Sequence, residues 1–221
     1  MVAGGYRKTA DLPRMIPVFP LDGALLLPGC SLPLQIFEPR YLNMVDDAMS
    51  GDRLIGMVQT RGGPPHRPKL ARVGCAGRIT SYAETGDGKY LITLTGVCRF
   101  EIGEELSIQA PYRQVLPAWE GFAEDLEVAD GDLEFDRQPF LAVLRRYLDH
   151  RGLGIEWEAV NVAPATALVN SLAMALPFDV AEKQALLEAP GVEQRRAALT
   201  ALLEIDAAAE QDDDDDPPSL Q

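Results

Sequence analysis

The chain of 221 residues has few of the side chains that metal sites and disulfide frameworks require. It has three cysteines, Cys30, Cys75 and Cys98, with no CxxC spacing, and only two histidines, His66 and His150. An odd number of scattered cysteines with so few histidines argues against structural zinc and against a disulfide framework. We therefore expect no metal and no cofactor, and we expect the cysteines to be small buried residues in a reducing cytosol.

The motifs of the common catalytic classes are also missing. The sequence contains no Walker loop GxxxxGK[ST], no GxGxxG, no GxSxG and no HExxH. A hydrolase would need a histidine or a cysteine beside an acid, but His66 lies in a proline-rich loop and His150 at a predicted helix end. No base or acid can be identified near Cys30. We predict that the chain is not an enzyme and assign no catalytic residue.

Long apolar runs are absent as well. No segment approaches the ~18 residues of a transmembrane helix, and the N-terminus shows no apolar stretch before a small-residue cleavage site. The chain is 47% hydrophobic and 24% charged, which is the composition of a globular protein of one large or two small domains. We expect a cytoplasmic protein with no membrane partner.

Charge is distributed unevenly. Residues 1–117 carry 13 basic and 11 acidic side chains, whereas residues 118–221 carry 7 basic and 23 acidic ones. The aspartates at 212–216 precede two prolines and repel one another, which predicts disorder over 207–221. A basic cluster consists of Arg53, Arg61, Arg67, Lys69, Arg72 and Arg78. It has no interleaved aromatic side chains to stack on bases, so we expect it to pair with the protein's own acidic segment.

The hydrophobic pattern changes along the chain. From residue 16 to residue 116, short apolar runs alternate with turn formers, and residues 85–88 predict a tight hairpin. One helix interrupts these strands, beginning at Pro39 and ending at Ser50-Gly51. Helical periodicity then dominates, with helices expected over 138–150, from about Pro164 to Leu176, between Asp179 and Pro190, and from about Val192. Asp179 and Glu182 have the spacing of a capping box.

Strands followed by helices predict an α+β chain. The predicted parts are a flexible N-terminus (1–13), a β-rich subdomain (14–117), an acidic connector (118–137), a helical bundle (138–206) and a disordered acidic tail (207–221).

Residues 16–45, IPVFPLDGALLLPGCSLPLQIFEPRYLNMV, carry the most specific motifs. This stretch resembles the Lon N-terminal domain family. The resemblance rests on FPL at 19–21, LLPG at 26–29 and LPLQIFEPRY at 32–41. Further support comes from VGCAGRI at 73–79, LTGVCRFEI at 94–102 and KQALLE at 183–188. The resemblance covers about residues 14–206.

The resemblance implies a fold similar to the PUA domain, followed by a helical bundle. It also implies binding of unfolded or extended polypeptides without cleavage, because no ATPase or peptidase segment accompanies the domain here. A protease or a chaperone is then a candidate partner, in protein quality control. The alternative is an RNA-binding protein that uses the PUA-like fold and the basic stretch 53–78. The strongly acidic remainder of the chain would repel nucleic acid, so this partner is less expected.

Two sets of site residues follow. Residues of the family motif to which we assign turn, cap and core roles are Pro28, Gly29, Leu34, Phe37, Glu38, Pro39, Arg40 and Tyr41. Leu34 and Ile36 should face one side of a strand while Pro33, Gln35 and Phe37 face the other. Glu38 should lie at a helix N-terminus, with Arg40 paired to an acid elsewhere. Aromatic and thioether side chains suit varied apolar segments, so we predict a partly exposed peptide-binding groove formed by Phe37, Tyr41, Met44 and Met57.

Overall fold

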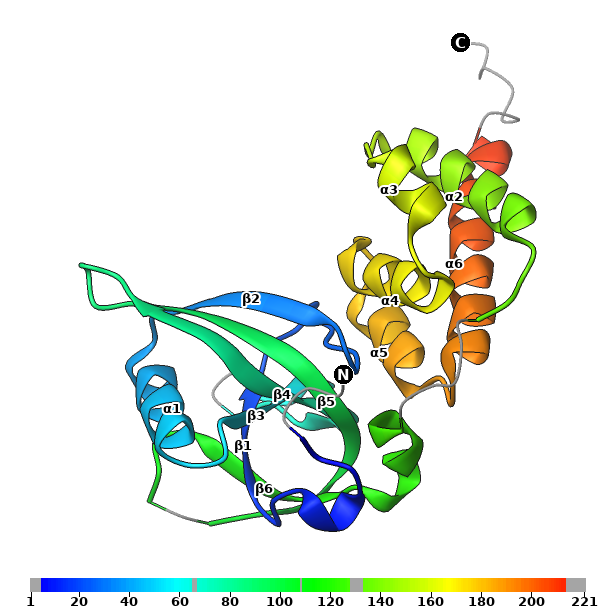
Figure 1. The fold of residues 1–221 in the computed structure, drawn as a ribbon. Helices are drawn as coiled ribbons and strands as arrows, with labels where there is room; N and C mark the ends of the chain where they lie inside the picture. Colours follow the sequence, from blue (N-terminus) through cyan, green and yellow to red (C-terminus); the bar gives the residue numbers. More distant parts are fainter. Residues whose placement is uncertain (1–4, 65–66, 108, 128–132, 214–221) are drawn as a thin grey trace. The chain divides into compact units, whose positions relative to one another are not determined.

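The computed structural model describes residues 5–64, 67–107, 109–127 and 133–213, with side chains up to residue 206. The chain divides into two compact units (Figure 1). The sheet unit comprises Met1–Asp130 with Met174–Glu188, and the helical unit comprises Gly131–Ala173 with Ala189–Gln221. The predicted α+β class is confirmed.

A six-stranded sheet dominates the sheet unit, in the order β2-β5-β4-β3-β1-β6. The strands are β1 (Ile16–Pro20), β2 (Ser31–Ile36), β3 (Leu54–Thr60), β4 (Leu70–Glu84), β5 (Tyr90–Glu105) and β6 (Arg113–Ala118). β1 and β3 are parallel, and the other neighbours are antiparallel. Because β6 pairs with both β1 and β5, the sheet closes on itself and β2 remains an edge strand.

Strands β4 and β5 are 15 and 16 residues long and join runs that the sequence pattern separates. The predicted turn connects them, since Glu84 pairs with Tyr90 across it. Register shifts interrupt their pairing at two places, and such irregularities bend long strands. Gly96 of β5 lies so close to the loop between β1 and β2 that a Cβ there would be 2.1 Å from the carbonyl oxygen of Leu27. Only glycine permits this approach.

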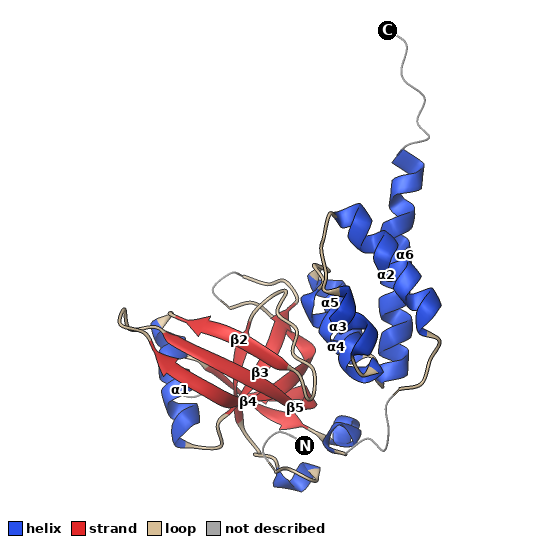
Figure 2. Cartoon of the chain, turned by 45° about the horizontal axis from the view of Figure 1, so that its top comes forward, coloured by secondary structure: helices blue, strands red, loops and turns tan. Residues whose placement is uncertain are grey.

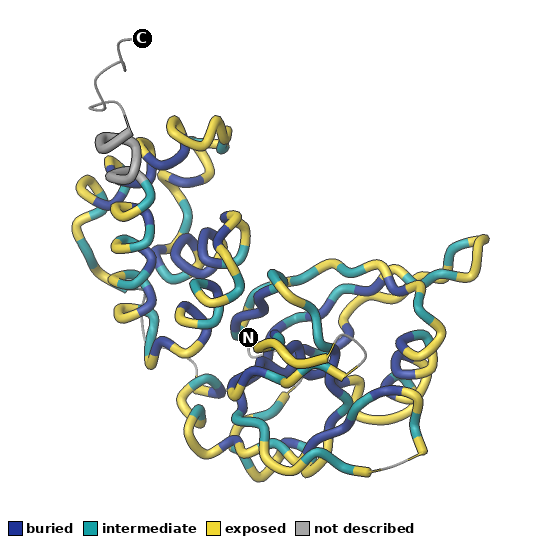
Figure 3. Tube along the Cα trace, turned by 180° about the vertical axis from the view of Figure 1, so that it is seen from behind, coloured by how far each residue is buried: buried dark blue, intermediate teal, exposed yellow. Residues whose placement is uncertain are grey.

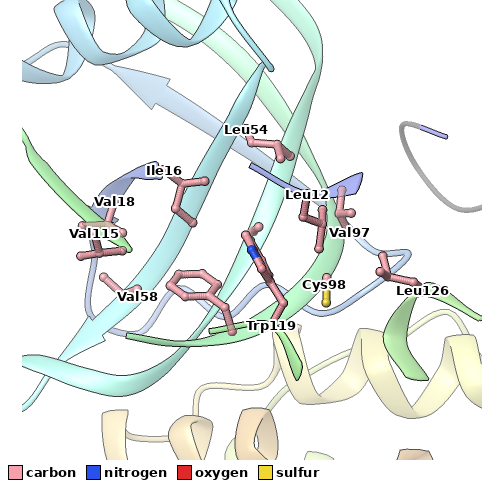
Figure 4. Packing of buried hydrophobic residues seen from close by; sticks show 12 residues of the cluster. Leu12, Ile16, Val18, Leu54, Val58, Val97, Cys98, Val115, Trp119 and Leu126 are labelled. Atoms are coloured by element: carbon pink, nitrogen blue, oxygen red, sulfur yellow. The ribbon is translucent and has the colours of Figure 1, made fainter. Parts of the chain in front are cut away.

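The core of the sheet unit reaches beyond the predicted β-rich segment (Figure 4). Leu12, which follows the 3-10 helix η1 (Thr9–Asp11), is 6% exposed, and Leu126, in η2 (Glu120–Leu126), is 3% exposed. Trp119 packs against Phe100 with ring centroids 5.5 Å apart. Residues 1–13 were predicted to be a flexible N-terminus, and residues 118–137 an acidic connector. The described parts of both segments instead contribute side chains to the core. Single apolar side chains within polar stretches anchor both segments to the core.

Helix α1 (Pro39–Ser50) forms where proline at its first position and Gly51 after its end predict it. Its buried face consists of Tyr41, Met44, Val45 and Ala48. Figure 2 shows this helix beside the strands of the sheet unit.

The helical unit contains α2 (Arg137–Arg151), α3 (Trp157–Val162), α6 (Val192–Asp213) and all but the last two residues of α4 (Ala165–Ala175). Helix α2 ends at Gly152, whose φ of 60° is the left-handed conformation of a helix C-cap. The short α3 has no counterpart in the prediction. The predicted disorder over 207–221 is corrected in part, because the backbone of α6 remains helical to Asp213. Residues 214–221 lie outside the described residues.

Helix α5 (Val180–Glu188) groups with the sheet unit, which corrects its assignment to the helical bundle of residues 138–206. Gln59 of β3 donates from Nε2 to the carbonyl oxygen of Val180 at 3.2 Å. Lys183 donates from Nζ to the carbonyl oxygen of Gly23 at 2.8 Å. Burial lowers the pKa of Lys183. Such buried polar contacts hold α5 on the sheet although some 120 to 160 residues separate the partners.

Candidate polypeptide-binding surface

Three of the four residues predicted to form a peptide-binding groove are buried. Met44 is 0%, Met57 2% and Tyr41 6% exposed. Tyr41 and Met44 lie on the face of α1 that packs inward, and the Tyr41 ring lies 4.3 Å from that of Phe19. Met57 lies in β3, which has neighbours on both sides. The prediction of a groove shared by these side chains is therefore wrong, because their apolar character serves the core.

Phe37 differs from the other three, since it is 62% exposed. It directly follows β2, two positions after Gln35, and the side chains of a strand alternate between faces. The burial pattern agrees with the predicted alternation, because Ile36 is buried while Pro33, Gln35 and Phe37 are exposed. Phe37 thus lies on the solvent side of the sheet edge.

Strands β5 and β4 extend this exposed side. Gln35 pairs with Leu91 of β5, and Leu91 pairs with Ala83 of β4, so the three side chains share one face. Leu91 is 46% exposed and Ala83 is also exposed. We call the apolar group Pro33, Phe37, Ala83 and Leu91 the outer face. Exposed residues continue along the β4–β5 hairpin (Figure 3).

The free edge of β2 is protected against strand addition. Gly96 donates from its backbone N–H to the carbonyl oxygen of Cys30. The register of β2 and β5 pairs Ser31 with Thr95, and continuing it by one position places Cys30 opposite Gly96. By antiparallel alternation, Leu32, Leu34 and Ile36 then bond to β5 and Pro33 faces the free edge. Proline has no N–H to offer a further strand, and prolines at such positions blunt sheet edges. At the β2 edge, the outer face is therefore available through its side chains rather than through a backbone ladder.

Of the remaining motif residues, Pro28 and Gly29 have the expected turn roles, while Glu38 and Arg40 require corrections. Gly29 has a φ of 76° and Pro28 forms a bridge with Gly96, so both shape the turn into β2. Glu38 is the N-cap of α1 but its side chain accepts no capping hydrogen bond. It pairs instead with Arg40 at 2.8 Å, so the acid that binds Arg40 is local rather than distant.

Two of the six residues of the basic cluster form ion pairs with glutamates of β5, and not with the acidic connector. Arg72 pairs with Glu101 at 2.9 Å, and Arg67 with Glu105 at 3.3 Å. Arg113 forms a second pair with Glu105 at 2.7 Å, and its hydrogen bond lowers the pKa of that carboxyl group. For Arg67 and Arg72, the expected pairing with the acidic segment is therefore wrong, because their acids lie on β5.

A groove of about 790 Å³ within the sheet unit was not anticipated from the sequence. It is lined by Asp22, Thr60, Arg61, Gly62, Ala71, Arg72, Val180, Ala181, Gln184, Ala185 and Glu188. Its small apolar side chains come from β4 and α5, and its polar groups are largely engaged with one another. Asp22 accepts from the backbone N–H of Thr60 at 2.7 Å, and Gln184 donates to Glu188 at 2.7 Å.

The described candidates for catalysis are two buried cysteines, the half-buried Cys30, and His150 in the last turn of α2. Burial raises the pKa of the Cys75 thiol well above its usual value and that of Cys98 to about 12, so both stay protonated. Cys30 is half-buried, and His150 lies 3.7 Å from Asp206. His66 lies outside the described residues.

Within the described ranges, no three His, Cys, Asp or Glu side chains converge as a metal-ligand set. In the same part of the chain, no helix is both long and apolar enough to cross a bilayer.

Comparison with known proteins identifies similar chains. The model of the ATP-dependent protease La (LON) substrate-binding domain matches residues 15–204. The Lon protease of Syntrophus aciditrophicus is 27% identical over 211 residues, which cover 89% of this chain and 26% of that protein. Lon protease 2 of Myxococcus xanthus is 28% identical over 217 residues, covering 92% and 25%. The chain thus spans about a quarter of the length of these relatives.

Solved structures agree on the fold. The Lon N-terminal domain protein from Xanthomonas campestris has a TM-score of 0.60 at 23% identity, covering 85% of this chain and 97% of that one. The N-terminal domain of the Mycobacterium avium complex Lon protease has a TM-score of 0.57 at 18% identity, covering 86% and 98%.

Proposed function

Because the chain belongs to the family of the ATP-dependent protease La (LON) substrate-binding domain, we propose that it binds unfolded or extended polypeptides without cleaving them. Binding takes place at the outer face, where apolar side chains of the bound segment cover Phe37 and Leu91. In protein quality control, the chain acts as an adaptor that delivers such segments to a protease or a chaperone. A cytoplasmic location is part of this proposal.

One observation carries the assignment to the outer face. A phenylalanine that is 62% exposed and a leucine that is 46% exposed lie on the same side of neighbouring strands. An aromatic and an aliphatic side chain that stay exposed in the folded chain leave apolar surface for a partner. The protected edge of β2 keeps the same region from pairing with another sheet.

Polypeptide is preferred over RNA on electrostatic grounds. Arg67 and Arg72 of the basic stretch lie opposite glutamates, which reduces the charge that these two arginines offer a phosphate backbone. Salt dependence separates the two functions. Apolar binding changes little with ionic strength, whereas RNA binding falls steeply as salt rises.

The test is fluorescence anisotropy with a labelled, permanently unfolded polypeptide. Phe37→Ser and Leu91→Ser should each weaken binding by about tenfold or more, since burying such a side chain contributes about 1.5–3 kcal/mol. Leu116→Ser is the matched control, because Leu116 is 38% exposed on β6, outside the outer face. Equal affinity of all three variants would refute the assignment.

A further inference from the structure

Strand β4 runs on beyond β3, its neighbour on one side. The pairing of β3 with β4 ends at Arg78, which lies opposite Leu54. Ile79 then donates from its N–H to the carbonyl oxygen of Arg53 at 2.8 Å. Residues 81–84 are all exposed, and among the described strands they pair with β5 alone. Figure 1 shows the hairpin of β4 and β5 reaching past the other strands. We call residues 81–84 the β4 edge.

The hydrogen-bond pattern of the hairpin shows which backbone groups this edge presents. Thr85 donates from its N–H to the carbonyl oxygen of Lys89 at 2.8 Å. Because bonded and non-bonded pairs alternate in an antiparallel ladder, Ala83 bonds to β5, whereas Tyr82 and Glu84 point their N–H and carbonyl groups away from it. Within the described ranges, no hydrogen bond occupies these outward groups. The β4 edge therefore offers donors and acceptors to a further strand.

The β4 edge lacks the protection found on β2. Proteins commonly blunt an exposed edge with proline, lysine or a bulge. Pro33 does so on β2, but residues 81–84 contain neither proline nor lysine. The register shift in this part of β4 ends at Ser81, and the pairing from there to Glu84 is regular. A regular exposed edge is the surface to which an extended peptide adds as a strand.

Apolar side chains flank this edge on both faces of the hairpin. Ala83 lies beside Leu91 on the outer face, and the small side chain of alanine leaves that face open toward the edge. On the opposite face, Tyr82 is 39% exposed and its ring lies 5.0 Å from that of Tyr90. A strand added here would place alternate side chains beside Ala83 and the intervening ones beside Tyr82.

We propose that the β4 edge binds an extended segment of the polypeptide as an added strand, so that alternate side chains of the segment continue the outer face. The proposal rests on the proposed function and adds the class of segment to it, one in β conformation with apolar residues at alternate positions and no proline. The continuity of Ala83 with Leu91 argues for this occupant. A formal charge of -14 on each chain opposes a second copy.

Amide hydrogen exchange of the whole chain tests this proposal, with and without a soluble peptide of alternating leucine and threonine residues. With the peptide at about ten times its Kd, exchange of the Tyr82 and Glu84 amides should slow by about tenfold. Gln35 is the internal control, because its N–H faces the free edge of β2 and should keep its rate.

Two variants measure the contribution of the backbone to peptide affinity. Glu84→Pro and Glu84→Gln both remove the charge, but only the proline removes the N–H that faces the added strand. Glu84→Pro should bind the peptide about fivefold more weakly than Glu84→Gln, the ratio expected for one hydrogen bond. Equal affinities of the two variants would contradict the added strand.

The exchange measurement separates the possible failures. Slowed exchange at Tyr82 and Glu84 but not at Gln35 supports the added strand, even if Glu84→Pro disturbs the hairpin. Peptide binding that leaves the Tyr82 and Glu84 amides unchanged overturns it and leaves polypeptide binding intact. If the peptide does not bind at all, the proposed function fails with it. Slowing that depends on protein concentration without peptide assigns the edge to a second copy and overturns the proposal.

Discussion

The buried ion pair of Arg99 and Asp125 allows a sharp test of how the sheet unit holds together. Asp125 accepts from Arg99 Nε and Nη2, both at 2.8 Å, and from the Arg99 backbone N–H at 2.9 Å. Arg99 also donates from Nη1 to the carbonyl oxygen of Leu187 in α5 at 3.1 Å. The two side chains are only 4% and 9% exposed. Asp125→Ala would therefore leave a guanidinium in the interior without its counter-charge.

The expected loss of unfolding free energy in Asp125→Ala follows from this burial. Burial alone lowers the pKa of Arg99, but the hydrogen bonds and the charge of Asp125 outweigh it and raise the pKa. Arginine stays charged even without its partner, and removing one member of a buried pair destabilises by about 3–5 kcal/mol. Glu101→Ala breaks the exposed pair with Arg72, whose side chain is 70% exposed, and should lose only about 0–1 kcal/mol.

Urea unfolding measures both losses. Trp119 lies in the core beside Phe100, so its fluorescence reports on the sheet unit once Trp157 is replaced by phenylalanine. Arg99→Met combined with Asp125→Leu should recover most of the stability, because no charge is then left buried. If Asp125→Ala loses no more than Glu101→Ala, the pair does not stabilise the unit as argued.

Two further predictions concern the sheet and its acid stability. Gly96→Ala places a Cβ against the Leu27 carbonyl and should lower the free energy of unfolding by about 3 kcal/mol. Gly86→Ala is the control, because no atom lies within 4 Å of its added Cβ, and it should change the free energy of unfolding by less than about 0.5 kcal/mol. Denaturant titrations that give equal values would contradict the close approach. Hydrogen bonding from Arg113 lowers the pKa of Glu105, so its contribution to stability is present above the ordinary value of 4.5 and lost as pH falls through the lower folded value. Glu105→Gln should therefore lose less stability than the unaltered protein between about pH 6 and about pH 3, and an unchanged acid slope would speak against this.

Local signals in the sequence predicted local structure well. Asp179 and Glu182 form the expected capping box, with reciprocal hydrogen bonds of 2.7 and 2.8 Å. The hairpin after Glu84 and the helix from Pro39 also form where turn and cap residues predict them. Each of these features depends on residues within a few positions of one another.

Long-range packing could not be predicted in the same way. Helix α5 joins the sheet unit through contacts with Gln59 and Gly23, which no periodicity within the helix announces. Leu12 and Leu126 enter the core from segments whose average composition is polar. Composition describes a segment as a whole, whereas one well-placed side chain decides whether that segment docks.

The candidate site shows the same division. Alternation along β2 predicted that Phe37 shares a face with Pro33 and Gln35, opposite Ile36, and their exposure agrees with this, but alternation did not say which face meets solvent. It did not show that Met57 has strands on both sides, nor that Leu91 lies on the same face as Gln35, because strand order and register determine both.

Site-specific photocrosslinking tests polypeptide binding at the outer face most directly. Benzoylphenylalanine is incorporated at position 37, and in a control protein at position 116, and each is irradiated with a labelled unfolded polypeptide. The account predicts a crosslink from position 37 that excess unlabelled polypeptide abolishes, and little from position 116. Equal yields from both positions, or no crosslink at position 37, would contradict it.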